Sequence, residues 1–472
     1  MGAKPFPADP SLSQLEIATD PKRMREVFQR HLRPLGEETY RIRECKVSHV
    51  RYRQATRCVL LYTLRLEEPD TGQEWSQRVS GIMQAGGKTR RIWERLRRSS
   101  SGLEVSEISP VFEPFSYIPE LEMLVQVFPY DHQLPALPLL MAGLPPELEP
   151  LLLARFGPGD WRVEAWDVEP VRYLADLRAT LRMTVRARDT ATGRAEERRF
   201  YAKVYRKEER GEQTYQALQA LWDRVSVGGA GFTVGRPIVY LSGLRTLVQE
   251  EVPGTSLRNE LLREEDVVPV MRKAARSLAT LHLDRMPKLR RHSLRDEVAD
   301  LKETGKLLQQ ACPRLAPEIE EIVGAVIAGL EEVPPAPTHR DLGPADILID
   351  GDRLALVDLD AFSEADPLLD VARVLAGLAV MPLRHSLPHE RARTAARAFA
   401  EEYFVHVPEV WRARLPLHLA AALLKRAAGL LRHQQPDWPD KVEALVKKAK
   451  DSLAGRAWWQ EGLEDQDRGG DA

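Results

Sequence analysis

The sequence is poor in cysteine, in long hydrophobic runs and in net charge. Its 472 residues include three cysteines, Cys45, Cys58 and Cys312, which are too few for a disulfide framework and lack the CxxC spacing of a zinc site. The longest apolar stretch, 134–156, is interrupted by prolines and acidic residues before it could cross a bilayer. A formal net charge of −2 disfavours a protein that coats nucleic acid or an anionic membrane.

Targeting signals are also missing at the N-terminus. Residues 1–14 contain no continuous apolar segment of a secretory signal, and Phe6 stands where a myristoylation signal requires Ser or Thr. We therefore expect a cytoplasmic protein. At roughly 150 residues per domain, the length predicts about three globular units.

Two segments of the chain repeat one pattern. VRYRQATRCVLLYTLRLEEPDTG at 50–72 and VRYLADLRATLRMTVRARDTATG at 171–193 share Val-Arg-Tyr and the last glycine at an offset of 121. Leu-Val-Gln recurs at 124–126 and 247–249, at an offset of 123. Both long segments alternate apolar and polar residues and end in turn residues, so we predict two copies of one β-rich unit.

Helical patterns complete this organisation. Each copy continues into a helical segment, at 88–98 and 211–225, and beyond residue 256 the sequence is mainly helical. The Pro- and Gly-rich residues 142–161 mark the join between the copies, and the acidic tail 461–472 is predicted to be disordered.

A group of carboxylates follows residue 338. Asp346 comes five residues after His339-Arg340-Asp341, and a hairpin around the Asp350-Gly351-Asp352 turn leads to Asp358. Asp341 is suited to accept a proton from a hydroxyl, and Asp346 and Asp358 supply the hard oxygens that Mg²⁺ prefers. The alternative is that these acids are solvated turn residues, but the spacing and the strands around them favour a metal site.

The segment HRDLGPADILIDGDRLALVDLDAF at 339–362, followed by DPLLDVAR, resembles the catalytic segment of the aminoglycoside phosphotransferase and choline kinase-like family. The resemblance covers roughly residues 160–450. It implies an α+β, protein-kinase-like bilobal fold, with an antiparallel β-sheet N-lobe and a mainly helical C-lobe. It implies Asp341, with His339 beside it, as the catalytic base and Asp358 as a metal ligand. Asp346 stands where the family has asparagine, which adds a negative charge beside the other two carboxylates.

The resemblance also implies nucleotide-binding residues in the second copy. Lys203 lies in an apolar strand, where a lysine is unusual without a task, and it would bind the nucleotide phosphates. We expect Glu212 to turn inward with Leu218 and to pair with Lys203, with Glu208 and Glu209 as weaker candidates. The alternative is that all three glutamates are solvated.

Further positions follow from the same resemblance. The turn 173–178 would cover the phosphates; it contains no glycine, but its backbone amides can still approach phosphate and Arg178 adds positive charge. Residues 248–254 are similar to the family's hinge, so the backbones of Glu250 and Val252 would contact adenine. Acidic residues downstream are candidates for substrate or structural roles, namely Asp360, Asp366 and Asp370. Asp366 would either contact the substrate or serve as the N-cap of a helix that begins at Pro367. His282 is expected to pack at a helix end.

The first copy lacks the phosphate-binding lysine. The offset of 121 carries Lys203 back to Ile82. We therefore predict a degenerate N-lobe-like α+β domain at 1–145, a kinase N-lobe at 160–254, and a helical C-lobe at 255–460 with its catalytic loop at 339–346. The first domain would cap the active N-lobe, shape substrate access or bind a protein partner, and the basic run 88–98 would either meet an anionic partner or form a solvated helix face.

These expectations describe an ATP-dependent kinase that transfers the γ-phosphate to a hydroxyl of a small molecule, with Mg²⁺ or Mn²⁺ and without nucleic acid or membrane partners. The alternative is a nucleotide-binding pseudokinase or scaffold, favoured by Asp346 and the glycine-free turn. A protein kinase ranks last, because the segment between Asp358 and Asp366 is short for peptide docking. The sequence leaves the acceptor open, although the basic stretch 382–399 disfavours a polycationic one.

Overall fold

The computed structural model describes residues 9–36, 39–99, 111–228, 231–286, 289–435 and 437–460. The predicted disordered tail, 461–472, lies outside the described residues. The chain divides into two compact units. Unit 1 comprises Met1–Glu212, Pro237–Glu251 and Arg432–Gln434, and unit 2 comprises Gln213–Arg236, Val252–Leu431 and Gln435–Ala472.

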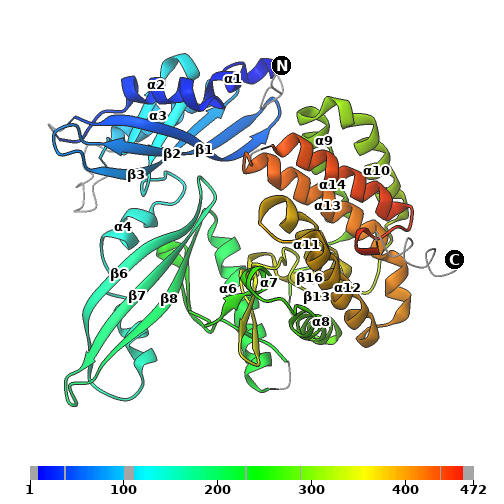
Figure 1. Cartoon of the computed structure of the whole chain (residues 1–472). Helices are drawn as coiled ribbons and strands as arrows, with labels where there is room; N and C mark the ends of the chain where they lie inside the picture. Colours follow the sequence, from blue (N-terminus) through cyan, green and yellow to red (C-terminus); the bar gives the residue numbers. More distant parts are fainter. Residues whose placement is uncertain are drawn as a thin grey trace. The chain divides into compact units, whose positions relative to one another are not determined.

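Unit 1 contains two five-stranded antiparallel sheets (Figure 1). The first sheet has the order β1-β2-β3-β5-β4, with β1 (Arg41–Arg53), β2 (Arg57–Glu67), β3 (Glu74–Gln84), β4 (Phe115–Ile118) and β5 (Met123–Val127). The helices of this part are α1 (Leu15–Ala18), α2 (Pro21–His31) and α3 (Lys88–Ser99). Helix α2 begins where the Asp20 side chain caps two backbone amides, and it buries Met24, Val27 and Phe28.

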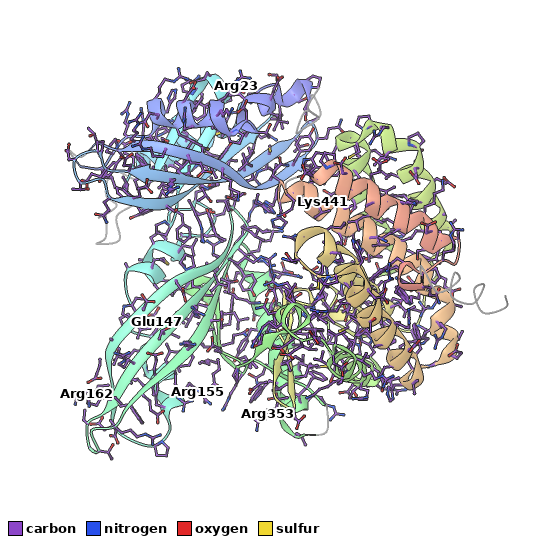
Figure 2. All side chains as sticks on the ribbon, in the orientation of Figure 1. Arg23, Glu147, Arg155, Arg162, Arg353 and Lys441 are labelled. Atoms are coloured by element: carbon purple, nitrogen blue, oxygen red, sulfur yellow. The ribbon has the colours of Figure 1, made fainter. Side chains whose placement is uncertain are left out.

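The second sheet has the same strand order, read from the other edge as β6-β7-β8-β11-β10. Its strands are β6 (Trp161–Leu174), β7 (Arg178–Asp189), β8 (Ala195–Tyr205), β10 (Pro237–Leu241) and β11 (Thr246–Glu250). Between the sheets in sequence lie α4 (Ala136–Ala142) and α5 (Glu149–Leu153). One hydrophobic core joins the two sheets through these helices, because Ile82 and Leu124 belong to the same cluster as Leu137, Leu181 and Val204. Charged side chains such as Arg23 and Arg162 are exposed (Figure 2).

The strand register reproduces the sequence repeat. In the first sheet Ile82 pairs with Val59 on one side and Leu124 on the other. In the second sheet Lys203 pairs with Thr180 and Leu247, which are the residues that the offsets of 121 and 123 predict. The two β-rich copies are therefore equivalent in three dimensions, while the domain boundaries at 145 and 160 stay a prediction.

Unit 2 is mainly helical. Its long helices include α8 (Val268–Leu283), α9 (Leu294–Ala311), α10 (Ala316–Gly329), α11 (Leu368–Arg384), α12 (His389–His406), α13 (Leu415–Arg432) and α14 (Trp438–Leu453), with the shorter α7 (Leu257–Arg263). Helix α6 (Glu208–Ser226) spans the division between the units. Helix α12 packs against α8 and α11 (Figure 1). Most of α11 is buried, because its residues are apolar or small on all sides.

Short strands in unit 2 frame the predicted catalytic loop. β14 (Ile347–Asp350) and β15 (Arg353–Leu356) form a hairpin within the sheet β12-β14-β15-β9, whose outer strands are β12 (Thr255–Ser256) and β9 (Thr233–Val234). β13 (Ala336–Thr338) pairs with β16 (Ser363–Ala365). Among the residues that the structure describes, no helix is long and apolar enough to span a membrane.

Candidate active site

The loop after β13 is anchored to α11 through Asp370. This carboxylate is fully buried, and it accepts hydrogen bonds from the backbone amides of His339 and Arg340, at 2.7 and 2.6 Å. His282 Nε2 lies 3.2 Å from the same carboxylate, and its Nδ1 lies 2.7 Å from the Tyr403 hydroxyl. Burial opposes ionisation, but the bond to His282 and the nearby His339 lower the pKa of Asp370. The catalytic loop thus begins at a fixed position, and His282 packs at the end of α8 as predicted.

His339 supports this loop from inside. Its side chain is buried, Nε2 donates to the Val357 carbonyl at 2.8 Å, and Nδ1 accepts from the Asp341 amide at 3.4 Å. These bonds connect the residue before Asp358 with Asp341. We predicted His339 among the catalytic residues, but its contacts are with backbone groups, which is the arrangement of a positioning residue.

Asp341 presents its carboxylate to solvent. The side chain is 53% exposed, and its Oδ1 accepts a hydrogen bond from Arg373 Nη1 of α11 at 3.0 Å. Behind the loop, Arg426 of α13 lies 3.4 Å from the Leu342 carbonyl and 3.2 Å from the Arg373 carbonyl. The sequence interpretation missed both arginines. Arg373 stands three residues after Asp370, inside the quoted segment DPLLDVAR, which was the available signal.

Asp346 and Asp358 lie at the open end of the β14–β15 hairpin. Ile347 pairs with Leu356, and the Val357 amide donates to the Asp346 carbonyl at 2.9 Å, so the two acids flank the last paired residues. Asp346 Oδ2 accepts from the Gly343 amide at 2.9 Å. Burial raises the pKa of Asp346 to about 6; the charges of Asp358 and Asp341 add to this, and His339 opposes it.

This set of donors fits a hard divalent cation. The carboxylates repel one another, so a cation held by Asp346 and Asp358 would be favoured, and Mg²⁺ completes its shell with phosphate oxygens and water. Compact groups of three potential ligands lie elsewhere among the described residues, at Asp131-His132-Asp176 and His292-Glu297-Asp300. Asp346 and Asp358 would therefore supply only part of the ion's coordination shell, and the remaining ligands would come from phosphate oxygens and water.

The predicted nucleotide-binding residues lie on several elements. Lys203 is 7% exposed and lies near the C-terminal end of β8. Glu212 lies near the start of α6 and is exposed rather than turned inward, and its pairing with Lys203 stays a prediction. Arg178 begins β7 opposite Leu174 and Tyr205.

The predicted hinge coincides with the division between the two units, after Glu251. Glu250 ends β11, and its side chain forms an ion pair with Arg155. Val252 follows the strand and is half-buried. The side chain of Glu250 is thus engaged within unit 1, which leaves its backbone as the group for the predicted adenine contact.

The downstream acids are embedded in unit 2. Asp366 forms ion pairs with Arg414 and with His418 Nε2, the latter at 3.1 Å, and its Oδ1 accepts from the Leu368 amide at 3.0 Å. These partners lower the pKa of Asp366 to about 2, although burial opposes them. Asp360 is 7% exposed in a short 3₁₀ turn. The contacts of Asp366 favour the structural alternative over a substrate contact.

The model of the phosphotransferase enzyme family matches residues 179–417, which is just over half of the chain. The chain belongs to this family. The predicted kinase-like α+β fold and the predicted activity class, an ATP-dependent small-molecule phosphotransferase, are confirmed at this level.

Solved structures of this fold class match most of the chain. The aminoglycoside phosphotransferase APH(4)-Ia, in a thermostable mutant, is 14% identical with a TM-score of 0.44, covering 65% of this chain and 98% of that one. A choline/ethanolamine kinase family protein from Mesorhizobium loti is 15% identical with a TM-score of 0.41, covering 68% of this chain and 97% of that one. APH(2")-IIa, in a ternary complex with streptomycin and ATP, is 13% identical with a TM-score of 0.39, covering 66% of this chain and 99% of that one. No curated protein matches the chain.

Proposed function

We propose that this phosphotransferase transfers the γ-phosphate of ATP to a hydroxyl of a small acceptor. The observation that carries the proposal is an exposed carboxylate, Asp341, on a loop that the buried Asp370 holds in place. Phosphoryl transfer depends mainly on positioning and charge neutralisation, and a fixed, accessible base meets the first need.

Each residue has a defined part in this proposal. Asp341 orients the acceptor hydroxyl and accepts its proton. Lys203 binds the nucleotide phosphates, and Asp346 and Asp358 hold the divalent ion. When bound, Mg²⁺ or Mn²⁺ supplies positive charge that offsets the charge of the phosphate oxygens.

The test is ATP consumption by the purified full chain with a panel of hydroxylated acceptors. Asp341→Asn should lower kcat about 1,000-fold or more and leave the thermal shift caused by MgATP unchanged. Asp350→Asn is the matched control, because Asp350 is an exposed acid on the neighbouring β14–β15 hairpin, and it should have normal kcat. Full activity of Asp341→Asn would refute the assignment.

We further propose an acceptor that is neutral or anionic. Arg373 Nη1 binds Asp341, and Arg426 Nη2 lies 3.4 Å from the Leu342 carbonyl. Two guanidinium groups therefore contact the loop 341–344, and positive charge there repels a cationic acceptor. With gluconate, glucose and glucosamine as probes, kcat/KM should fall in that order; the reverse order would contradict the proposal.

The second candidate function is a nucleotide-binding scaffold, which Asp346 favours because an amide stands there in the family. The variant Asp346→Asn distinguishes a working kinase from a nucleotide-binding scaffold. If the chain is a working kinase, this change alters the preference between Mg²⁺ and Mn²⁺ and does not create activity. If the chain is a scaffold, the wild type binds MgATP without turnover, and restoring asparagine produces turnover.

A further inference from the structure

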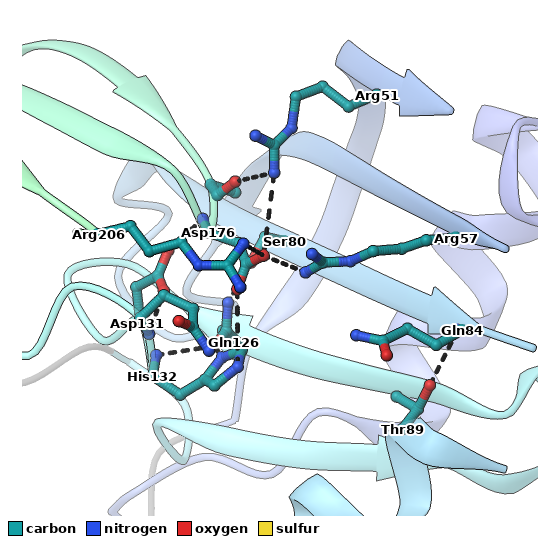
Figure 3. A network of polar contacts seen from close by, with 12 residues as sticks. Arg51, Arg57, Ser80, Gln84, Thr89, Gln126, Asp131, His132, Asp176 and Arg206 are labelled. Atoms are coloured by element: carbon teal, nitrogen blue, oxygen red, sulfur yellow. Dashed lines mark hydrogen bonds and ion pairs between the residues drawn. The ribbon is translucent and has the colours of Figure 1, made fainter. Parts of the chain in front are cut away.

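The turn between β6 and β7 is held in place by hydrogen bonds that its backbone amides donate (Figure 3). Asp176 has a left-handed backbone, with φ of 63°, and is fully buried. Its amide and the Tyr173 hydroxyl both donate to Asp131 Oδ2, at 2.6 and 2.9 Å. The next amide, of Leu177, donates to the Leu174 carbonyl at 3.0 Å. Two of the turn's amides are therefore engaged within the protein and are not presented to a ligand.

Arginines of the first sheet hold the same turn from the opposite side. Arg57 of β2 donates to Asp176 Oδ2, and Arg51 of β1 donates to the Ala175 carbonyl at 2.8 Å. Arg51 and Arg206 also place guanidinium nitrogens 3.9 and 3.8 Å from Asp176 Oδ2 (Figure 3). A buried carboxylate is unfavourable unless it is paired, and these three arginines supply the pairing.

The first sheet contains half of this arrangement. Asp9 Oδ2 accepts from the Ala55 amide at 2.8 Å and from the Tyr52 hydroxyl at 2.7 Å, and Ala55 is left-handed with φ of 54°. Asp9, Tyr52 and Ala55 thus correspond to Asp131, Tyr173 and Asp176. We call this arrangement, in which an aspartate accepts hydrogen bonds from a tyrosine hydroxyl and from the amide of a left-handed turn residue, the clamp. Both copies have the clamp, but only the second copy has a carboxylate, Asp176, that pairs with the other sheet.

A metal site is the other explanation for this cluster, because Asp131, His132 and Asp176 bring ligand atoms within 4.8 Å of one another. Most of the potential ligand atoms are already engaged, and the remaining two, Asp176 Oδ1 and His132 Nε2, face each other at 3.6 Å. Asp131 accepts three hydrogen bonds, counting the Gln133 amide at 2.8 Å, and His132 Nδ1 lies 2.6 Å from the Gln126 side-chain oxygen. The surrounding guanidinium charges also oppose a cation, so the contacts favour an ion-pair network.

We propose that Asp176 and Arg57 are positioning residues that make this turn a fixed wall, held by the first sheet, instead of a mobile flap that closes its amides over nucleotide phosphates. The inference rests on the proposed function and on the prediction from the sequence that the turn 173–178 lies at the nucleotide phosphates. The first copy then supports nucleotide binding without binding a nucleotide itself. Contacts with the phosphates fall to Lys203 and to the metal held by Asp346 and Asp358.

Hydrogen exchange of the full chain, with and without AMP-PNP and Mg²⁺, tests the proposal. In the wild type, the amides of Asp176 and Leu177 should be protected and should not change with the nucleotide. Asp176→Gly removes the carboxylate and tolerates the left-handed backbone, so exchange there should rise at least about tenfold and become sensitive to the nucleotide. The KM for ATP should rise about tenfold while kcat stays within about twofold, as expected for lost positioning.

Two further variants keep the test decisive. Arg57→Gln should act in the same direction as Asp176→Gly, and it decides the matter if Asp176→Gly does not fold. Arg186→Ala breaks an exposed pair with Glu197 elsewhere on the same hairpin, at 3.1 Å, and should change neither exchange at the turn nor KM. Fast exchange of the wild-type turn, or added protection with AMP-PNP, would overturn the proposal. If the wild type shows no thermal shift with AMP-PNP, the proposed function fails, whereas the exchange of Asp176→Gly against wild type still decides whether the turn is locked.

Discussion

The two sheets of unit 1 share strand order, register and turn conformation, yet they differ in the few side chains that bear chemistry. Lys203 sits between Thr180 and Leu247, and the first sheet has the apolar set Val59, Ile82 and Leu124 at the same places. Backbone ladders depend on main-chain groups, so they survive such a change. The comparison shows that two sheets can share one architecture although one has an isoleucine and the other a lysine at the same position.

The largest expected effect comes from replacing Lys203 of the second sheet with isoleucine, the residue at the equivalent position of the first sheet. Lys203→Ile should lower kcat/KM for ATP about 100- to 1,000-fold, because a charged donor to the phosphates is lost while the apolar strand tolerates isoleucine. Steady-state kinetics measure this, and Ile82→Val in the first sheet serves as the control with normal kinetics. Equal activity of Lys203→Ile and wild type would remove the functional distinction between the sheets.

The reverse exchange tests the first sheet. Ile82 is fully buried, so Ile82→Lys should lower the free energy of unfolding by about 4 kcal/mol at pH 7 and should not create a second nucleotide site. Burial lowers the pKa of the introduced lysine in the folded state, so the loss is greatest at low pH and shrinks as the pH rises toward the ordinary lysine pKa. Urea unfolding at pH 7 and pH 9.5 measures the recovery; a stable variant with no pH dependence would show that the sheet can accommodate the charge.

The matched clamps should respond differently to pH. Hydrogen bonds from Ala55, Tyr52 and Ser11 lower the pKa of Asp9 against the effect of burial, whereas burial raises the pKa of Asp131. Asp9 therefore stabilises the fold above its unfolded pKa, and this contribution is lost as the pH falls through its lower folded value. Asp9→Asn should cost about 1 to 2 kcal/mol at pH 7 and less at about pH 2, while the cost of Asp131→Asn should not shrink on acidification. The free energy of unfolding of both variants, measured at the two pH values, tests this prediction. The same pH dependence for Asp9→Asn and Asp131→Asn would contradict the distinction.

The smallest effect concerns packing. A Cβ on Gly81 would lie 2.6 Å from Met123 Sδ, and the corresponding residues of the second sheet are Ala202 and Thr246. Gly81→Ala should therefore cost about 1 to 2 kcal/mol, since the flexible methionine absorbs part of the overlap. The double variant Gly81→Ala/Met123→Thr should recover most of this loss in thermal unfolding. If the stability effects of the two substitutions simply add in the double variant, the two positions are not coupled.

Much of the fold was predictable, because strands and registers leave periodic signals. The repeat offsets identified the pairs around Lys203, and the carboxylate spacing identified the hairpin with Asp346 and Asp358. The clamp was missed, although Asp-x-x-Leu occurs at both 9–12 and 131–134 and offered a signal. The outward position of Glu212 was also missed, because its helical spacing to Leu218 does not show which face of α6 is covered.

The sequence by itself determined the order of the elements, the duplication, the isoleucine in place of lysine at position 82 of the first copy, and the identity of the loop acids. These are local or periodic properties, set by residue type and spacing. Only the tertiary structure decided that Arg373 contacts Asp341, that Asp370 anchors the loop and that Arg57 reaches Asp176, across separations of 32, 31 and 119 residues. Such contacts depend on how whole elements pack, and burial makes the pairing of Asp370 and Asp176 necessary, because an unpaired carboxylate in the interior is strongly unfavourable.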